Sequence, residues 1–350
     1  MSARRGTLGR RAVFFLILAT VMGVVLLPVC YFLTISFSSN YEAYQFPAKL
    51  FPALSYSAQV RYNAAKESYT LLLGKNGGPE AVKTTSEVSD FVSYCKNQLN
   101  VEISSVEAQT LFDRAKAASG GVVQTRLKKD FFRNYVVFFI LADGTMRALV
   151  NSLKAAGWTI LISLLFGGVT GYLLARYKFR FGGAFGTGLL IVRMFPAVAL
   201  SLPLVVYIMR MNLYDTPFAL AIVYSVPNIA LTAWITSSIF KGISVELEEA
   251  AMVFGATRLR TLLTITFPLA FPAIVASSLY AFLAAWNDSI SALIMTNDNP
   301  TLALLVYRTV GSSTIPNLPA AGAVVLLIPS LIFTFIIKNY INQLWGKVAL

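Results

Sequence analysis

The 350-residue sequence contains no histidine and only two cysteines. Histidine is the commonest side-chain base and metal ligand near neutral pH, so its absence argues against zinc chemistry and Ser-His-Asp catalysis. Cys30 lies in an apolar run and Cys95 in a polar segment, and we expect no disulfide framework between them. The sequence therefore predicts neither a catalytic residue nor a metal site.

Charged residues are also scarce, at 13% of the chain, whereas soluble domains carry about 25%. Six apolar runs are long enough to cross a hydrocarbon layer, which takes about 20 helical residues. The first exceeds the 7–15 residues of a signal peptide and lacks its small-x-small cleavage site, so we expect an uncleaved helix. The sequence predicts an all-α integral membrane protein with six transmembrane helices, over residues 12–33, 155–175, 181–209, 216–240, 266–287 and 318–337.

The net charge of +13 would suit a nucleic-acid partner, but the basic residues stand beside the apolar runs. Basic flanks of this kind are typical of the cytoplasmic ends of membrane helices. We therefore predict a cell (inner) membrane protein with both termini in the cytoplasm and no nucleic-acid partner. The residues that support this orientation are Arg4, Arg5, Arg10, Arg11, Arg176, Lys178, Arg180, Lys241, Arg258, Arg260 and Lys347.

Residues 38–148 differ from the rest in holding 13 basic and 10 acidic residues. We interpret them as a soluble extracytoplasmic insert, preceded by a cytoplasmic N-terminus and first helix (1–37) and followed by a membrane core (149–350). Ser104 and Glu107 have the spacing of a capping box and predict a helix over 104–118. We expect a second helix over 86–99, and a strand or buried segment over 135–142.

A loop over residues 242–265, between the fourth and fifth runs, is predicted to be cytoplasmic. Ser244 suits a helix N-cap, and the acids at 246 and 248 suit a first turn. Gly255 suits the left-handed end of that helix, and a second helix should start near Thr257. A membrane-surface helix usually carries a basic polar face, whereas this one is acidic, so docking to a protein is favoured.

The same loop contains Glu249-Ala250-Ala251, then Gly255, Ile265 and Phe267-Pro268. This spacing resembles the EAA loop of ABC importer permeases. Residues 151–350 resemble the carbohydrate branch of that family, of the maltose and glycerol-phosphate type, through Met194-Phe195-Pro196, Trp286-Asn287-Asp288 and Gly346-Lys347-Val348. The resemblance implies an ABC importer type I permease fold and a sugar, oligosaccharide or polyol as solute, with glycerol phosphate left open.

By this resemblance, the coupling element that fits an ATPase subunit would be Glu249, Ala250, Ala251 and Gly255, with Lys347 and Val348 as further contacts. The implied partners are a similar but non-identical second permease subunit, two ATPase subunits, an extracytoplasmic solute-binding protein and membrane lipid. The sequence has no glycine-rich phosphate loop ending in Lys-Ser or Lys-Thr. The chain is therefore expected to bind no cofactor itself, with ATP and Mg²⁺ on the ATPase subunits.

Two features depart from that branch: the insert is longer, and Arg193 stands where an uncharged polar residue is expected. Intramembrane charges usually face a bundle interior or a water-filled cavity. Arg193, Asn228, Asn287 and Asp288 are therefore candidates for the solute pathway. Partnership with groups inside the bundle is the alternative for each, and for Arg193 the partner could also be an acid of a second subunit.

Two other functions stay open at this point. A secondary transporter or channel would need no ATPase, but such transporters usually show inverted repeats, and we find no convincing repeat. A membrane-anchored receptor could use the insert as a sensor, although six spans exceed what anchoring needs.

Overall fold

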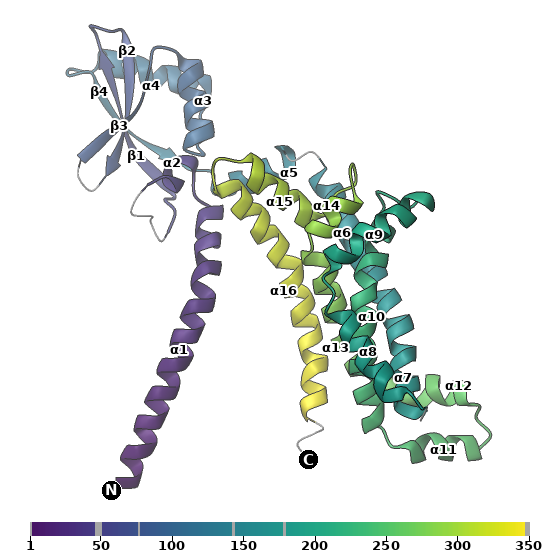
Figure 1. Ribbon diagram of the computed structural model, residues 1–350. Helices are drawn as coiled ribbons and strands as arrows, with labels where there is room; N and C mark the ends of the chain where they lie inside the picture. Colours follow the sequence, from purple (N-terminus) through teal and green to yellow (C-terminus); the bar gives the residue numbers. More distant parts are fainter. Residues whose placement is uncertain (1, 46–50, 76–77, 142–143, 178–179, 347–350) are drawn as a thin grey trace. The chain divides into compact units, whose positions relative to one another are not determined.

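The computed structural model describes residues 2–45, 51–75, 78–141, 144–177 and 180–346. The chain divides into two compact units (Figure 1). One contains Met1–Leu141 with Thr309–Val324, and the other contains Ala142–Arg308 with Val325–Leu350. Lys347 and Val348 lie outside the described residues.

The first unit begins with helix α1 (Ser2–Ser36), whose stretch Val13–Ser36 is apolar enough to cross a membrane. The insert then forms α2 (Asn40–Ala43) and an antiparallel sheet of β1 (Ser55–Asn63), β2 (Ser68–Lys75), β3 (Gly78–Thr85) and β4 (Val122–Lys128). The strand order is β3-β2-β1-β4. Helices α3 (Val88–Gln98), α4 (Ser105–Ala117) and α5 (Arg133–Leu141) complete this part of the chain.

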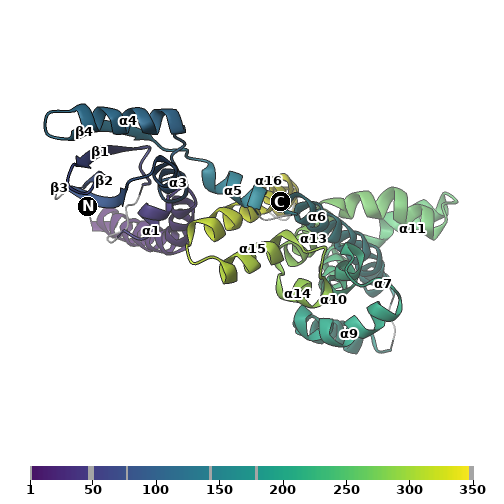
Figure 2. The ribbon, with the colours of Figure 1, turned by 90° about the horizontal axis from the view of Figure 1, so that it is seen from above.

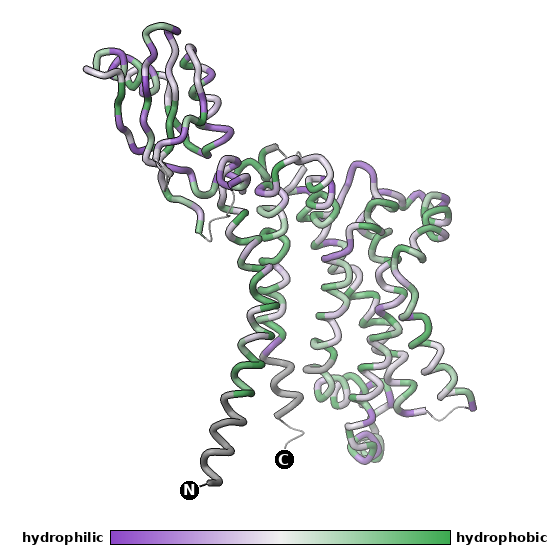
Figure 3. Tube along the Cα trace, turned by 60° about the vertical axis from the view of Figure 1, so that its left-hand side comes forward, coloured by the Kyte–Doolittle hydropathy of each residue, from purple (hydrophilic) through white to green (hydrophobic). Residues whose placement is uncertain are grey.

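The insert has its own hydrophobic core. Alternate residues of β1 (Tyr56, Ala58 and Val60) are buried, as expected for a strand with one covered face. They share a core with Phe91 of α3 and Phe112 of α4, so both helices cover that face of the sheet (Figure 2). In Figure 3 the insert mixes hydrophilic and hydrophobic residues, whereas the long helices are mostly hydrophobic.

Local sequence signals placed α3 and α4 correctly. Ser104 and Glu107 form both halves of the capping box: the Glu107 amide donates to Ser104 Oγ (3.2 Å), and the Ser104 amide donates to Glu107 Oε2 (3.0 Å). The strand or buried segment predicted over 135–142 is wrong where the structure describes it, because the segment is a helix and only part of it is buried. Those residues form α5, with Phe138 buried and Val136 and Ile140 exposed. β-Branched and aromatic residues favour strands only where a sheet offers a pairing edge. Here no such edge is offered, and the segment buries one face with the 3.6-residue period of a helix.

The second unit is helical. Helix α6 (Thr145–Ile162), the π-helical turn η1 (Ser163–Gly167) and α7 (Gly168–Arg176) form one candidate span. Helix α10 (Pro217–Gly242) is its most buried span and packs against α6, α7, α8 (Gly182–Arg193) and α13 (Phe267–Asn287) (Figure 1). The remaining helices of the chain are α9 (Ala197–Arg210), α11 (Val245–Val253), α12 (Arg258–Thr261), the π-helical turn η2 (Leu262–Thr266), α14 (Ile290–Met295), α15 (Leu302–Ser312) and α16 (Asn317–Gly346).

Among the described residues, four helices are long and apolar enough to span a membrane, or up to six if each of two bent pairs is one span. The third expected span, 181–209, is not one helix: α8 and α9 meet at 90°. The break falls at Met194-Phe195-Pro196. Pro196 has no amide hydrogen and disfavours helical backbone in the residue before it, which explains why the apolar run is interrupted here.

Close helix packing in this unit depends on two glycines. A Cβ at Gly167 would lie 2.7 Å from Thr232 Cβ, and one at Gly171 would lie 2.8 Å from the Ala233 carbonyl oxygen. Small residues spaced by four allow such close contact between membrane helices. This contact sets the position of α7 beside α10, and with it the position of Arg176 at the end of α7.

Candidate functional site

The loop between α10 and α13 folds as its sequence predicts, into a short helix, a turn and a second helix. Helix α11 begins after Ser244, and α12 begins after Thr257, whose hydroxyl accepts from the Arg260 amide (3.3 Å). Ser244 holds the N-cap position, but its hydroxyl donates to the Glu246 carboxylate rather than accepting from a backbone amide. The start of α11 is therefore capped less directly than expected.

Gly255 ends α11 in the left-handed region, with φ of +88°. The Gly255 amide donates to the Met252 carbonyl (2.9 Å), and the Ala256 amide donates to the Ala251 carbonyl (3.1 Å). These two bonds form a Schellman motif, in which glycine avoids the steric cost of a side chain. The turn then leads through α12 and η2 directly into α13.

Glu248 points away from solvent and bonds to three side chains of the bundle. Its Oε1 lies 2.8 Å from Arg176 Nη2 at the end of α7 and accepts from Thr266 Oγ1 (2.8 Å) just before α13. Its Oε2 accepts from the Tyr172 hydroxyl (3.2 Å) on α7. The side chains of Arg176 and Glu248 are only 7% and 8% exposed.

Arg176 extends this contact to the end of α10. Its Nη1 donates to the Phe240 carbonyl (2.7 Å) and its Nη2 donates to the Ile243 carbonyl (3.1 Å). The Phe240 carbonyl also accepts from the Ile243 amide (3.2 Å), so the guanidinium adds a second donor there and supplies one to Ile243 at the C-terminus of α10, where carbonyls lack the donors of a following turn. We call Arg176, Glu248, Tyr172 and Thr266 the α11 anchor, because they join α11 to α7, to the end of α10 and to the start of α13.

The anchor favours a charged Glu248. Burial acts to raise the pKa of Glu248, but hydrogen bonds from Arg176 and Thr266, with the positive charge of Arg176, outweigh burial and hold its pKa below the ordinary value. At neutral pH the anchor is therefore a buried, hydrogen-bonded ion pair.

The opposite side of α11 is open. Glu249 and Ala250 are exposed, Ala251 is half-buried, and Val253 and Phe254 at the turn are 85% and 91% exposed. An acid beside two small residues and two apolar side chains forms a surface that another protein could approach closely. The structure thus places the four predicted coupling residues, Glu249, Ala250, Ala251 and Gly255, together on one short element.

Of the four solute-pathway candidates, the structure brings Asn228 and Asp288 to one residue, because Tyr224 accepts from Asn228 through its carbonyl and lies 3.5 Å from Asp288 Oδ1 through its hydroxyl. Arg193 is exposed at the end of α8, and Asn287 is exposed at the end of α13. Asn228 is buried, and its Nδ2 donates to the Tyr224 carbonyl of its own helix (2.8 Å). Asp288 accepts from the Ser291 amide (2.7 Å). The last two contacts fit the alternative of partners inside the bundle.

The residues that sequence reasoning missed are those of the α11 anchor. Glu248 was interpreted as a first-turn acid and Arg176 as a cytoplasmic flank. One signal was available: Val245, Glu248 and Met252 share a face of α11, which places an acid on an otherwise apolar stripe. The partner, 72 residues earlier, had no local signal.

Comparison with known proteins gives concordant matches. Residues 167–347, just over half of the chain, match the family described as "Binding-protein-dependent transport system inner membrane component". The chain is 33% identical over 199 residues to a putative ABC transporter permease protein, ORF1, of Streptomyces antibioticus, covering 56% of this chain and 87% of the relative. It is 31% identical over 215 residues to the trehalose transport system permease protein SugB of Mycobacterium tuberculosis. That match covers 60% of this chain and 78% of the relative.

This chain also matches a solved structure of a bacterial ABC transporter involved in the import of the acidic polysaccharide alginate. The match covers 96% of this chain and 98% of the chain in that structure. The TM-score is 0.57 and the sequence identity 18%, so this likeness concerns the fold. It agrees with the type I importer permease fold expected from the sequence.

Proposed function

The chain belongs to the family of binding-protein-dependent transport system inner membrane components, and from that membership we propose a function. It is the transmembrane permease subunit of an ATP-driven importer for a sugar, oligosaccharide or polyol. The solute class rests on relatives such as the trehalose permease. A secondary transporter or channel finds no support in these matches.

The observation that carries the proposal is the two-sided geometry of α11. Glu249, Ala250, Ala251 and Gly255 form the surface that docks on an ATPase subunit, and Lys347 and Val348 contribute a second contact. The ATPase subunits bind ATP and Mg²⁺, and this chain binds neither. A second, similar permease subunit completes the pathway, and an extracytoplasmic solute-binding protein delivers the solute.

The α11 anchor explains how docking would move the bundle. A displaced α11 can move independently of α7 only by separating Glu248 from Arg176, which leaves two buried charges unpaired. Breaking a buried ion pair costs about 3–5 kcal/mol. Movement of the ATPase is therefore transmitted to α7, to the end of α10 and to the start of α13, and the cavity alternates between inward- and outward-facing states.

Within that cavity we assign Arg193, Asn228, Asn287 and Asp288 unequal roles. Asn228 and Asp288 support the bundle through their hydrogen bonds. The side chains of Arg193 and Asn287 have no ion pair or hydrogen bond within the described part of the chain, so they are available to a solute or to the second permease subunit.

The test is a charge reversal at the docking surface in the assembled importer. Glu249→Lys places a cation where the proposal needs an acid, so ATPase subunits should be lost from the purified complex, and solute-stimulated ATP hydrolysis should fall at least tenfold. Asp113→Lys reverses an exposed charge on α4 and should leave ATPase retention unchanged. Full retention and normal stimulation with Glu249→Lys would refute the docking assignment.

A further inference from the structure

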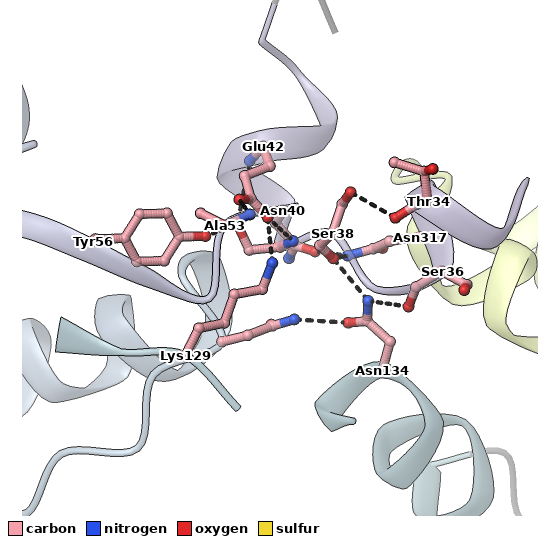
Figure 4. A network of polar contacts seen from close by, with 12 residues as sticks. Thr34, Ser36, Ser38, Asn40, Glu42, Ala53, Tyr56, Lys129, Asn134 and Asn317 are labelled. Atoms are coloured by element: carbon pink, nitrogen blue, oxygen red, sulfur yellow. Dashed lines mark hydrogen bonds and ion pairs between the residues drawn. The ribbon is translucent and has the colours of Figure 1, made fainter. Parts of the chain in front are cut away.

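Helix α5 is attached by one face to the end of α1. Asn134 Nδ2 donates to the carbonyl oxygens of Ser36 (2.8 Å) and Ser38 (2.7 Å), as Figure 4 shows. Beside it, the Phe131 ring stacks on Phe37 with centroids 4.4 Å apart. Asn134 is buried, so this attachment fixes the orientation of α5 about its own axis.

The other face of α5 is apolar and uncovered. Phe132, Val136, Phe139 and Ile140 are 62%, 46%, 39% and 67% exposed. With 3.6 residues per turn, Val136, Phe139 and Ile140 fall within an arc of about 100°, and Phe132 stands in the turn that directly precedes the helix. That width is typical of the buried stripe of an amphipathic helix, and yet here the stripe is exposed.

Two features place this stripe at a membrane surface. The face opposite to it is bonded to Ser36, the last residue of the candidate span Val13–Ser36. The next candidate span begins at Thr145, four residues after α5 ends, and four residues extend at most about 14 Å. Helix α5 thus lies between two consecutive helices that contain candidate spans, and Asn134 bonds it to the end of the first of them.

The composition of α5 suits lipid as the occupant. The helix contains no acidic residue, so anionic headgroups would not repel it. Near its start Tyr135 lies against Phe37, with ring centroids 5.2 Å apart, and tyrosine is one of the two residue types enriched at the membrane–water interface.

We propose that α5 is an interfacial helix and that membrane lipid covers its Phe132–Val136–Phe139–Ile140 face at the boundary between headgroups and acyl chains. The polar side of α5 holds the insert: Asn100 Nδ2 donates to Asn134 Oδ1 (3.0 Å), and Arg133 Nη1 lies 3.1 Å from Glu102 Oε1. The insert is therefore held at a set height above the bilayer. This inference is independent of the solute and of ATPase docking.

The experiment measures lipid contact directly. Ile140→Cys and, separately, Val136→Cys are introduced in a Cys30→Ser background and labelled with an environment-sensitive fluorophore. Cys95 is buried, and burial raises the pKa of its thiol to about 12, so it stays unlabelled. Val106→Cys on α4, 76% exposed, is the matched control for an exposed valine away from α5.

In proteoliposomes containing the complete importer, nitroxide-bearing lipids should quench the Ile140 and Val136 labels several-fold more than the Val106 label. Aqueous iodide should show the reverse order. Iodide quenching at Ile140 equal to that at Val106 would overturn the proposal. Protection from both quenchers, with cross-linking to a neighbouring subunit, would overturn it too and assign the stripe to a protein partner.

Discussion

Glu248 and Glu249 are neighbours in α11, and they face opposite environments. Glu249 is exposed, whereas the side chain of Glu248 is 8% exposed and bonded to Arg176. A carboxylate in solvent is free to meet a partner protein, while one buried against a guanidinium holds its own chain in place. We therefore propose separate roles for these adjacent acids, Glu249 in docking and Glu248 in transmission.

Replacing Glu248 by Gln tests the second role. The amide keeps the shape of the side chain but leaves the Arg176 charge uncompensated. The free energy of unfolding of the variant should therefore be lower by about 3 kcal/mol. Amide hydrogen exchange over 245–253 should rise in parallel. Glu246→Gln, at an exposed position bonded only to Ser244 among the described residues, should change stability by less than about 0.5 kcal/mol.

The pH dependence supplies a control for this prediction. The pKa of Glu248 is lowered in the folded protein. Its contribution to the free energy of unfolding is therefore present above the ordinary glutamate pKa and is lost as the pH falls through the pKa of the folded state. The difference in Tm between the native chain and Glu248→Gln should therefore be largest near neutral pH and shrink in acid. A difference that grows in acid would contradict the assignment.

At the scale of secondary structure, the turn after α11 depends on one backbone conformation. Gly255 has φ of +88°, and a Cβ there would meet no atom within 4 Å, so any cost of a side chain is conformational. Gly255→Ala should cost roughly 1–2 kcal/mol and reduce solute-stimulated ATP hydrolysis. Gly242→Ala, equally open but without a positive φ, should have little effect on that activity.

The contact between α7 and α10 makes a contrasting prediction, because there the cost is steric. A Cβ at Gly171 would lie 2.8 Å from the Ala233 carbonyl oxygen and 2.9 Å from the Ser237 amide nitrogen, and both are backbone atoms. Gly171→Ala should force the helices apart and cost about 1–3 kcal/mol, measured as a lower Tm in detergent. Gly168→Ala meets nothing within 4 Å and should be neutral or slightly stabilising.

For the whole molecule, the bent pair of α8 and α9 decides which side of the membrane α11 faces. If the pair is one span, three crossings separate the insert from α11, and they lie on opposite sides. If the pair is re-entrant, two crossings place them on the same side. The importer needs the first arrangement, with α11 in the cytoplasm.

Single cysteines at Val106 and Val253, in a Cys30→Ser background, distinguish the two arrangements. In intact cells a membrane-impermeant maleimide should label Val106→Cys, and it should label Val253→Cys only after permeabilisation. Labelling of both positions in intact cells would remove the basis for ATPase docking at α11.

The sequence by itself determined the features that local chemistry controls. Apolar runs of about 20 residues indicated the membrane helices, and Ser104 with Glu107 indicated the start of α4. Gly255 and Thr257 indicated the turn after α11. Each of these signals acts through helix geometry, φ limits or solvent transfer within a few residues, and therefore needs no knowledge of the remaining chain.

Only the tertiary structure decided which distant residues meet. The bond between Arg176 and Glu248 depends on how closely α7 approaches α10, which Gly167 and Gly171 allow. The helix at 133–141 likewise depends on the fold, which offers residues 135–141 no strand to pair with, whereas the break at Pro196 follows from proline itself and lay hidden within one apolar run. Long-range pairing depends on the shape of whole helix surfaces, and neither composition nor spacing in one sequence encodes that shape locally.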